Sequence, residues 1–359
     1  MKVELDGVRP WRHDLAGCLH ACVGTLVDHA GFPPLEVLGS FWGFYYRPGD
    51  IRPEEYYFPC PDGRSLVASL APHHPVGSRW WWPEDAEQGW QQVREQVAAG
   101  VPVAVAVDNF ELPFRPAYRD VHSNHLVVVR GFDDERQTVS VLDAIPPFFS
   151  GELPLAVLTA ARDSANRPAH ARDMFFADDP IGNRWLQLLV EDGPGGRQPA
   201  GADPAGYLAG NLREFQAGSE PGCYRGRDGI ARFLADMCDR LAAGYGITDE
   251  LFVVAGVALA GAAVHADWVA ETGRRQQLPG WPELARQISR TAYHWTAIRI
   301  LAALSRTGDV PATRLRARRA ALLAELDRTL AAVEVVLATT EPSGHPNHRR
   351  ALAEENSHG

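Results

Sequence analysis

The hydrophobic pattern of the chain changes from strand-like to helix-like about 160 residues from its N-terminus. Residues 101–107, 125–130 and 138–142 are rich in Val and bounded by turn residues, which predicts three strands, the last two joined as a hairpin by residues 133–137. Further along, apolar residues recur at helical spacing. These helical segments are 205–216, 226–244, 250–272, 282–306 and 310–339. The sequence therefore predicts an α+β domain followed by a mainly helical domain.

Composition suggests where the domains end. Residues 1–162 carry the predicted α+β domain, and residues 205–340 carry the helical domain. Between them, residues 163–204 are rich in Gly, Pro, Asn and Asp, so we expect a linker or an irregular segment. Residues 341–359 are polar and lack periodicity, which predicts a disordered tail.

The bulk numbers exclude several classes of protein. The 359 residues are 45% hydrophobic and carry a formal net charge of −10, with no basic stripe beside a nucleic-acid-binding motif, so we expect no nucleic-acid partner. The N-terminus lacks the apolar segment of a secretory signal, and the most apolar stretch, Leu251–Val264, is short for a membrane span. The five cysteines are scattered and do not suggest a disulfide framework. We expect a cytoplasmic protein with no membrane partner.

A cysteine lies near the start of the first predicted helix. Residues 14–30 have helical spacing, with Asp14 as the expected N-cap and Gly31 as the stop. Cys18 would then lie in the first turn or so, where the positive end of the helix dipole and unpaired N–H groups favour the thiolate. The same N–H groups can stabilise an oxyanion. Cys18 is therefore a candidate nucleophile.

A histidine and an aspartate occupy matching positions on the predicted hairpin. His125 begins one strand and Asp143 follows the next, and neighbouring antiparallel strands bring such side chains within reach. A cysteine nucleophile needs a base and a group that orients the base. Taken singly, such residues are more often a buried cysteine and a structural histidine, and the aspartate is often only a turn residue. Their order and placement favour a Cys18–His125–Asp143 triad.

Two alternatives compete around the first helix. Cys22 lies one turn after Cys18 and becomes the nucleophile if the helix begins later than expected; we favour Cys18 because it is nearer the predicted cap. The group Cys18, His20, Cys22 and His29 also suggests metal ligation. No second Cys/His pair follows at zinc-site spacing, however. We therefore expect no metal and no other cofactor.

Four segments resemble, in the right order, the N-terminal domain family of butirosin biosynthesis protein H. They are 18–31, in which a Cys opens a helix that ends at Gly; 103–114, a strand followed by Asp and a Leu-Pro-aromatic turn; 125–133, the His strand; and 141–144, the Asp strand. That family is similar to papain-like and double-glycine-leader peptidases. The resemblance implies a papain-like cysteine-nucleophile domain over residues 14–160, and the helical half resembles the region that often follows it.

The resemblance implies acyl transfer in secondary metabolism, of the kind used in antibiotic biosynthesis. Cys18 would be acylated by the thioester of an acyl-carrier protein or of a small molecule. His125 would act as general base and acid, and Asp143 would orient its ring. The acceptor would be a small-molecule amine, and the helical domain would shape the acceptor side or mediate self-association, for example as a homodimer.

Four more residues are expected to bind substrate. Asp108 follows a strand of the family motif and would orient the amine; the alternative is a turn residue. Trp81, within the run 80–82, would form a pocket wall; the alternative is a plug over the core. His20 and Asn124 neighbour the proposed nucleophile and base in sequence and complete the set.

Two positions depart from the related families. Gly17 stands where family members often have His directly before the nucleophile, and Arg12 stands where papain-like peptidases have an oxyanion-binding Gln. His13 and the Cys18 amide are the remaining candidate donors. A cysteine hydrolase or cyclase that uses the same residues, or a catalytically silent binding or scaffold protein, are the alternative functions. If an acidic carrier protein docks, the candidate contacts are Arg12, Arg115, Arg119 and Arg130.

Overall fold

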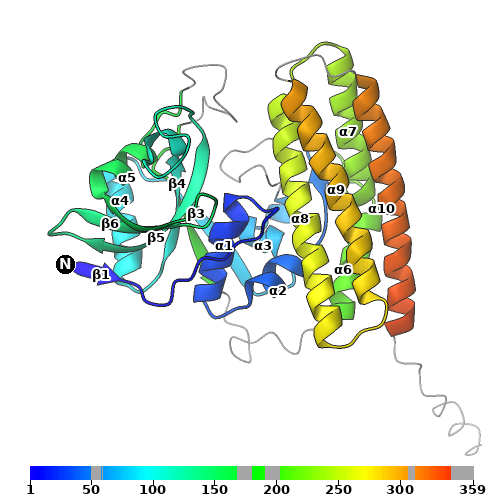
Figure 1. The fold of residues 1–359 in the computed structure, drawn as a ribbon, viewed down its shortest axis with the longest axis horizontal. Helices are drawn as coiled ribbons and strands as arrows, with labels where there is room; N and C mark the ends of the chain where they lie inside the picture. The colour runs from blue at the N-terminus through cyan, green and yellow to red at the C-terminus, as the bar shows by residue number, and fades with distance from the viewer. Residues whose placement is uncertain (50–57, 59, 168–179, 191–202, 306–311, 341–359) are drawn as a thin grey trace, which may run out of the picture.

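The structure, a computed structural model, describes residues 1–49, 58, 60–167, 180–190, 203–305 and 312–340. The predicted disordered tail, 341–359, lies outside the described residues. A sheet with its helices forms one part of the molecule and a bundle of long helices forms the other. Short helices near the N-terminus lie between them (Figure 1).

A seven-stranded antiparallel sheet organises the first part. Its strand order is β3-β8-β4-β5-β6-β7, and β1 pairs with the end of β5. The strands are β1 (Lys2–Glu4), β3 (Val76–Trp81), β4 (Val103–Asp108), β5 (Asn124–Asp133), β6 (Thr138–Asp143), β7 (Phe149–Pro154) and β8 (Trp185–Val190). The predicted β5–β6 hairpin is confirmed, with Val129 opposite Val141.

Helices cover both faces of this sheet. On one face, α1 (Cys18–His29) packs with α3 (Leu66–Leu70), and Val23 of α1 shares a core with Ala106 and Leu126. On the other face lie α4 (Ala86–Ala98) and α5 (Leu155–Arg162). Every residue of β4 is buried, as expected for a strand between two helical layers. The observed class is the predicted α+β arrangement.

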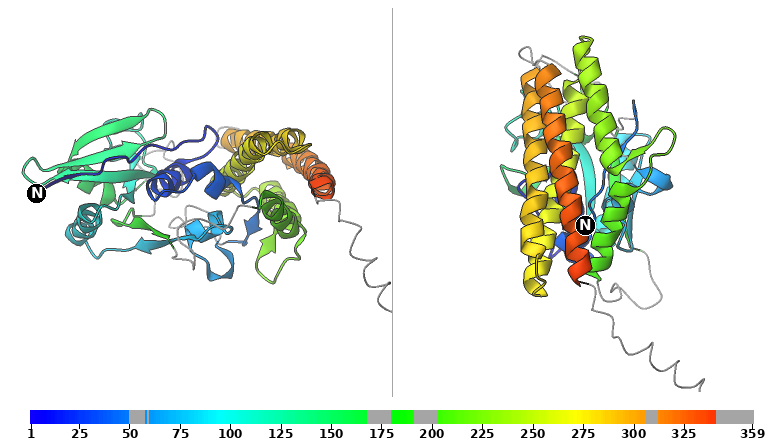
Figure 2. Two further views of the ribbon diagram at one scale, coloured as in Figure 1. Left: turned by 90° about the horizontal axis from the view of Figure 1, so that it is seen from below. Right: turned by 90° about the vertical axis from the view of Figure 1, so that its right-hand side faces the viewer.

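The second part is a bundle of long helices. It contains α6 (Pro204–Gln216), α7 (Gly226–Ala242), α8 (Thr248–Arg275), α9 (Trp281–Ser305) and α10 (Ala312–Thr340), all within three residues of the predicted segments (Figure 2). By length and composition α8 is apolar enough to cross a membrane, but most of that window is buried in the protein. A buried core helix passes the same test.

Helix α8 is held against the first part at one close contact. A Cβ on Gly39, at the end of α2 (Pro34–Gly39), would lie 2.6 Å from Cβ of Trp268 and 2.9 Å from the carbonyl oxygen of Val264, so the approach requires glycine. The Gly39 carbonyl also accepts a 2.7 Å hydrogen bond from Nδ1 of His265. This contact fixes α8 beside α2 and α1.

The predicted boundary between the two parts is wrong in two respects. Residues 163–204 are not only a linker, because Trp185–Val190 is β8, which pairs with β3 on one side and β4 on the other. The N-terminal residues also enter the bundle: Trp42, Phe44 and Tyr46 belong to its hydrophobic core. A two-stranded sheet joins β2 (Tyr45–Tyr46) to β9 (Tyr224–Arg225) and ties the parts together.

Candidate active site

The first helix begins at Cys18, not at the predicted Asp14. Gly17 is its N-cap, and no side chain caps it, because Asp14 forms an ion pair with Arg12 instead. The first helical hydrogen bond runs from the Ala21 amide to the Gly17 carbonyl. The amides of residues 18–20 therefore precede the helical ladder, and none of them has an intramolecular acceptor among the described residues. A thiol at the first helical position lies directly beside these donors.

The two rival cysteines occupy different environments. Cys18 is partly exposed and lines a cavity, whereas Cys22 is buried one turn further along α1. Burial, together with the charges of Cys18 and Asp143, raises the pKa of Cys22 well above its usual range. Cys22 is therefore held as a thiol in the core. The environment favours Cys18 as the reactive thiol.

His125 and Asp143 meet as the strand register predicts. Nε2 of His125 lies 2.8 Å from Oδ2 of Asp143, and both side chains are almost fully buried. Cys18 lies near enough to the His125 ring to contribute to the raised pKa of the histidine. The structure thus brings the three predicted residues together in the order Cys18–His125–Asp143, with the ring between thiol and carboxylate.

The surroundings of His125 favour its charged form. Burial acts to lower the pKa of His125, but the charge of Asp143 and hydrogen bonds to Asp143 and Cys18 outweigh it and raise the pKa to about 9. The imidazolium is therefore the dominant form at neutral pH.

Asp143 is fixed by two groups besides His125. Its Oδ1 accepts the Ile145 amide at 2.9 Å, and its Oδ2 accepts Nη1 of Arg115 at 3.1 Å. Burial acts to raise the pKa of Asp143, but His125, the Ile145 amide and Arg115 together lower it. Arg115 is thus part of this site, a role that sequence reasoning missed.

Arg115 was expected at a docking surface instead. Its Nη1 also donates to the carbonyls of Ile145 and Pro146, so its head group is turned inward. The other three arginines considered for docking each pair with a carboxylate of this chain. The pairs are Arg12–Asp14, Arg119–Glu111 and Arg130–Glu4.

A cavity of about 400 Å³ opens beside Cys18 between the two parts of the molecule. One wall is the start of α1 with Asn124 and Ile145, and the other is α8 with Arg299 of α9. The α8 lining is apolar or small. It consists of Phe252, Val253, Gly256, Val257, Leu259 and Ala260. The cavity can therefore hold a ligand with a large apolar portion.

Two of the predicted substrate-binding residues line this cavity, namely His20 and Asn124. His20 also borders a smaller apolar cavity of about 40 Å³, and burial lowers its pKa to about 4, so the ring is neutral. The candidate oxyanion donor His13 is engaged elsewhere: Nε2 contacts Asp267 at 3.0 Å, and Nδ1 accepts the Leu15 amide. The amides at the start of α1 are therefore the better-placed oxyanion donors.

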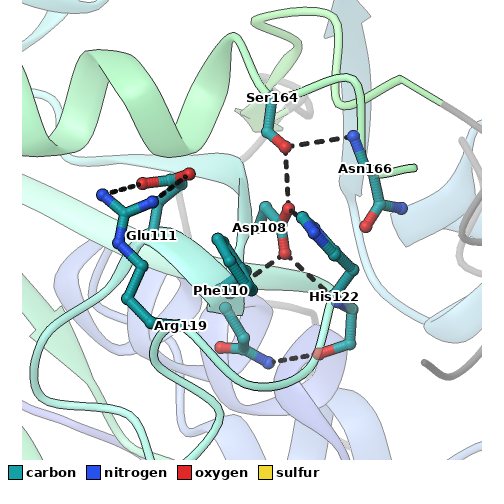
Figure 3. A network of polar contacts seen from close by, with 9 residues as sticks. Asp108, Phe110, Glu111, Arg119, His122, Ser164 and Asn166 are labelled. Atoms are coloured by element: carbon teal, nitrogen blue, oxygen red, sulfur yellow. Dashed lines mark hydrogen bonds and ion pairs between the residues drawn. The ribbon is translucent and has the colours of Figure 1, made fainter. Parts of the chain in front are cut away.

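Asp108 does not face the cavity. Its carboxylate is fully buried and contacts Nδ1 of His122 and Oγ of Ser164 at 2.7 Å each (Figure 3). It also accepts the amides of Phe110 and Ser123 at 3.0 and 3.1 Å. These four partners use the acceptor capacity of the carboxylate. The expectation that it orients an amine is corrected to a structural role.

Trp81 is not a pocket wall either. It lies at the end of β3, stacks on Trp185 at 5.4 Å between ring centroids, and donates its Nε1–H to Gln187. It packs with the core on the α4 and α5 side of the sheet, the face opposite α1. Neither the pocket wall nor the loop plug that the sequence suggested describes this strand residue. The far wall of the cavity, which includes Phe252 and Arg299, comes from helices in which the sequence analysis found no motif.

One comparison with known proteins gives a match in the first part of the chain. Residues 17–144 match the family model described as Butirosin biosynthesis protein H, N-terminal. This segment belongs to that family. The matched segment of this butirosin-protein-H-like domain includes Cys18, His125 and Asp143 and stops before α5 and the helical bundle. No curated protein matches the chain significantly. Within the described ranges, no group of three His, Cys, Asp or Glu side chains converges to hold a metal ion.

Proposed function

We propose that the chain is a cysteine-dependent acyltransferase with a papain-like nucleophile site, acting in antibiotic-type secondary metabolism. One observation carries the proposal: the Cys18 thiol, at a helix N-terminus and beside an apolar cavity, lies near a buried histidine that hydrogen-bonds Asp143. Thiol, base and orienting carboxylate are the parts that covalent acyl transfer needs. The family name of the N-terminal domain supports the metabolic setting.

In the first half-reaction the donor is a thioester. The thiolate of Cys18 attacks the thioester carbonyl carbon, and the carbonyl oxygen gains the negative charge. Collapse of the tetrahedral intermediate breaks the bond to the donor sulfur, and the His125 imidazolium gives its proton to that leaving thiolate. The products are an S-acyl Cys18, a free donor thiol and a neutral His125.

In this proposal the start of α1 stabilises the oxyanion. The amides of residues 18–20 lie before the first helical hydrogen bond, and Gly17 contributes no side chain to cover them. Backbone donors aimed at developing negative charge are worth roughly 3–4 kcal/mol of the activation barrier. This arrangement explains how the site can work with Arg12 at the position of the papain-like Gln.

In the second half-reaction an amine takes the acyl group. The amine nitrogen attacks the acyl carbon of S-acyl Cys18, His125 accepts the amine proton, and the Cys18 thiolate leaves. The product is an amide, and the imidazolium–thiolate pair is restored. We propose an acyl-carrier protein or a small-molecule thioester as donor and a small-molecule amine as acceptor.

The helical bundle supports transfer over hydrolysis. A transferase has to keep water from its acyl-enzyme. The α8 wall places Phe252, Val253 and Leu259 along the cavity next to Cys18, so part of the acyl intermediate would be covered by apolar side chains. A hydrolase would benefit from an open, polar site.

Product analysis tests this function. The protein is incubated with a panel of acyl N-acetylcysteamine thioesters, with and without aminoglycosides and simple diamines, and products are separated by mass. We expect amide formed at a rate that depends on the amine, and no amide with Cys18→Ser. Free acid formed at the same rate with every amine would identify a hydrolase instead. A cyclic product formed without added amine would identify a cyclase.

A second result would overturn catalysis altogether. If neither amide, cyclic product nor acid forms, the rate of iodoacetamide alkylation of Cys18 at pH 6 distinguishes a wrong donor from a silent scaffold. An activated thiolate reacts at pH 6 much faster than an ordinary cysteine. A rate equal to that of free cysteine would contradict the proposal and favour the scaffold.

A further inference from the structure

Among the described residues, a cation of the helical bundle lines the Cys18 cavity. Arg299 of α9 is half-buried, its Cζ lies 4.1 Å from the ring centroid of Phe252, and both residues line the cavity. Gly256 of α8 lies under the guanidinium, since a Cβ there would be 3.4 Å from Nε of Arg299. The side chain is therefore held in a defined place on the wall opposite Cys18.

Among the residues that the structure describes, no carboxylate pairs with this guanidinium. Its Nε is buried without a hydrogen-bond partner, and the guanidinium makes no hydrogen bond or ion pair with any other residue that the structure describes. Burial alone acts on Arg299 and lowers its pKa, as expected where no counter-charge opposes desolvation. Asp14 is the one carboxylate among the cavity-lining residues described, and it is paired with Arg12.

Arginines with a structural role in this chain look different. Arg162, which is more deeply buried, donates to the carbonyls of Gly89 and Asn183, at 3.2 and 2.6 Å. Arg184 donates to the carbonyls of Pro180 and Ile181. Both therefore use backbone acceptors to offset burial. Arg299 instead borders the cavity and has no backbone acceptor among the described residues.

We propose that Arg299 binds an oxyanion of the thioester substrate, a carboxylate on the acyl chain or a phosphate on the pantetheine arm of the donor. This inference rests on the proposed function and specifies its substrate class. A guanidinium stacked on an aromatic ring keeps its donors directed at a carboxylate or phosphate. The adjacent apolar α8 lining would then hold the methylene portion of the same ligand.

Matched thioesters test which oxyanion is bound. The rate of Cys18 acylation, followed by intact-protein mass spectrometry, is compared for glutaryl-N-acetylcysteamine and its neutral methyl ester, and for butyryl-4′-phosphopantetheine and butyryl-pantetheine. A preference of roughly tenfold or more for the charged member of one pair is expected, because a charge-assisted hydrogen bond contributes about that much. The first pair reports a carboxylate and the second a phosphate.

The variants assign the preference to one residue. Arg299→Gln should abolish it and Arg299→Lys should keep part of it. Arg286→Gln, which removes an exposed arginine of the same helix paired with Glu283, should keep all of it. Equal rates for both members of both pairs in the wild type, or a preference that survives Arg299→Gln, would overturn the proposal. Thermal unfolding of each variant identifies a folding defect.

A binding measurement separates this inference from the proposed function. Glutarate or inorganic phosphate should slow iodoacetamide alkylation of Cys18 in the wild type and in Arg286→Gln, but not in Arg299→Gln. If no thioester acylates Cys18 while this protection is present, the anion site stands and the acyltransferase proposal fails. If thioesters acylate Cys18 but neither anion protects it and no charged thioester is preferred, the anion site fails alone.

Discussion

Among the described residues, two His–Asp pairs at neighbouring strand ends are built in almost the same way, and we expect them to have different roles. His125 contacts Asp143 at the end of β6, and His122 contacts Asp108 at the end of β4. The strands β4 and β6 flank β5, which His122 precedes and His125 enters, so both pairs arise at the same end of three neighbouring strands. Sequence and distance alone do not distinguish them.

Their neighbours do distinguish them. The His125 ring meets the Cys18 thiol beside a cavity. The His122 ring stacks on Phe110, with 4.1 Å between centroids, and Asp108 is shared with Ser164 and two backbone amides. A His–Asp pair becomes a candidate acid–base device only where a nucleophile and space for a substrate adjoin it. The other pair is expected to stabilise the fold.

The largest expected difference between the pairs lies in the acylation rate. His125→Gln removes the proton donor and acceptor of the reaction, so we expect the rate of Cys18 acylation to fall by roughly 10²–10⁴. His122→Gln should leave that rate essentially unchanged. The acylation rates of both variants are measured by stopping the reaction at set times and determining the intact protein mass. A large rate loss in His122→Gln, in a variant that unfolds like the wild type, would break the distinction.

The next difference lies in the pH dependence of stability. The pKa of His125 in the folded chain is about 9, above its ordinary value of 6.5. Its contribution is therefore fully present below pH 6.5 and is lost as the pH rises to about 9, on the order of 3 kcal/mol of the free energy of unfolding. Urea denaturation from pH 6 to pH 9 measures this decline.

Substitution of each aspartate sharpens the pH comparison. Asp143→Asn removes the charge that keeps His125 protonated, so burial of the ring then dominates its pKa. The decline in the free energy of unfolding between pH 6.5 and pH 9 should therefore disappear. In Asp108→Asn the decline should remain as in the wild type. A decline that persists in Asp143→Asn would show that another group causes it.

The smallest expected effect concerns Asp108 as a structural residue. Asp108→Asn replaces a carboxylate that accepts four hydrogen bonds, so we expect a loss of about 1–3 kcal/mol in the free energy of unfolding at pH 7. The Cys18 acylation rate should not change. Denaturation and acylation measured on one preparation test both parts. A lower acylation rate with an unchanged free energy of unfolding would show that Asp108 takes part in the reaction.

Local pattern was enough to predict most of the elements. Helical periodicity places α6 to α10 to within a few residues, and the Val-rich runs predict β4, β5 and β6. Neighbouring strands then imply that His125 meets Asp143. Strand β8 was missed because its six residues follow a Gly- and Asn-rich segment and find their partners in β3 and β4, far away in sequence.

Side-chain partners set the limit on predicting the site. Asp14 has the right residue type for a cap, but its carboxylate forms an ion pair with Arg12, and the helix begins only at Cys18. Asp108 ends a strand as Asp143 does, yet turns to His122. Arg299 is an isolated charge in an apolar helical run, and only packing of α8 against α2 places it opposite Cys18.

Intact-protein mass spectrometry after incubation with a panel of acyl thioesters tests the central claim most directly. The account predicts a single acyl adduct on the wild type and on Cys22→Ala, and none on Cys18→Ala. An adduct that survives Cys18→Ala but is lost in Cys22→Ala would contradict it. So would the absence of any adduct together with an ordinary rate of Cys18 alkylation at pH 6.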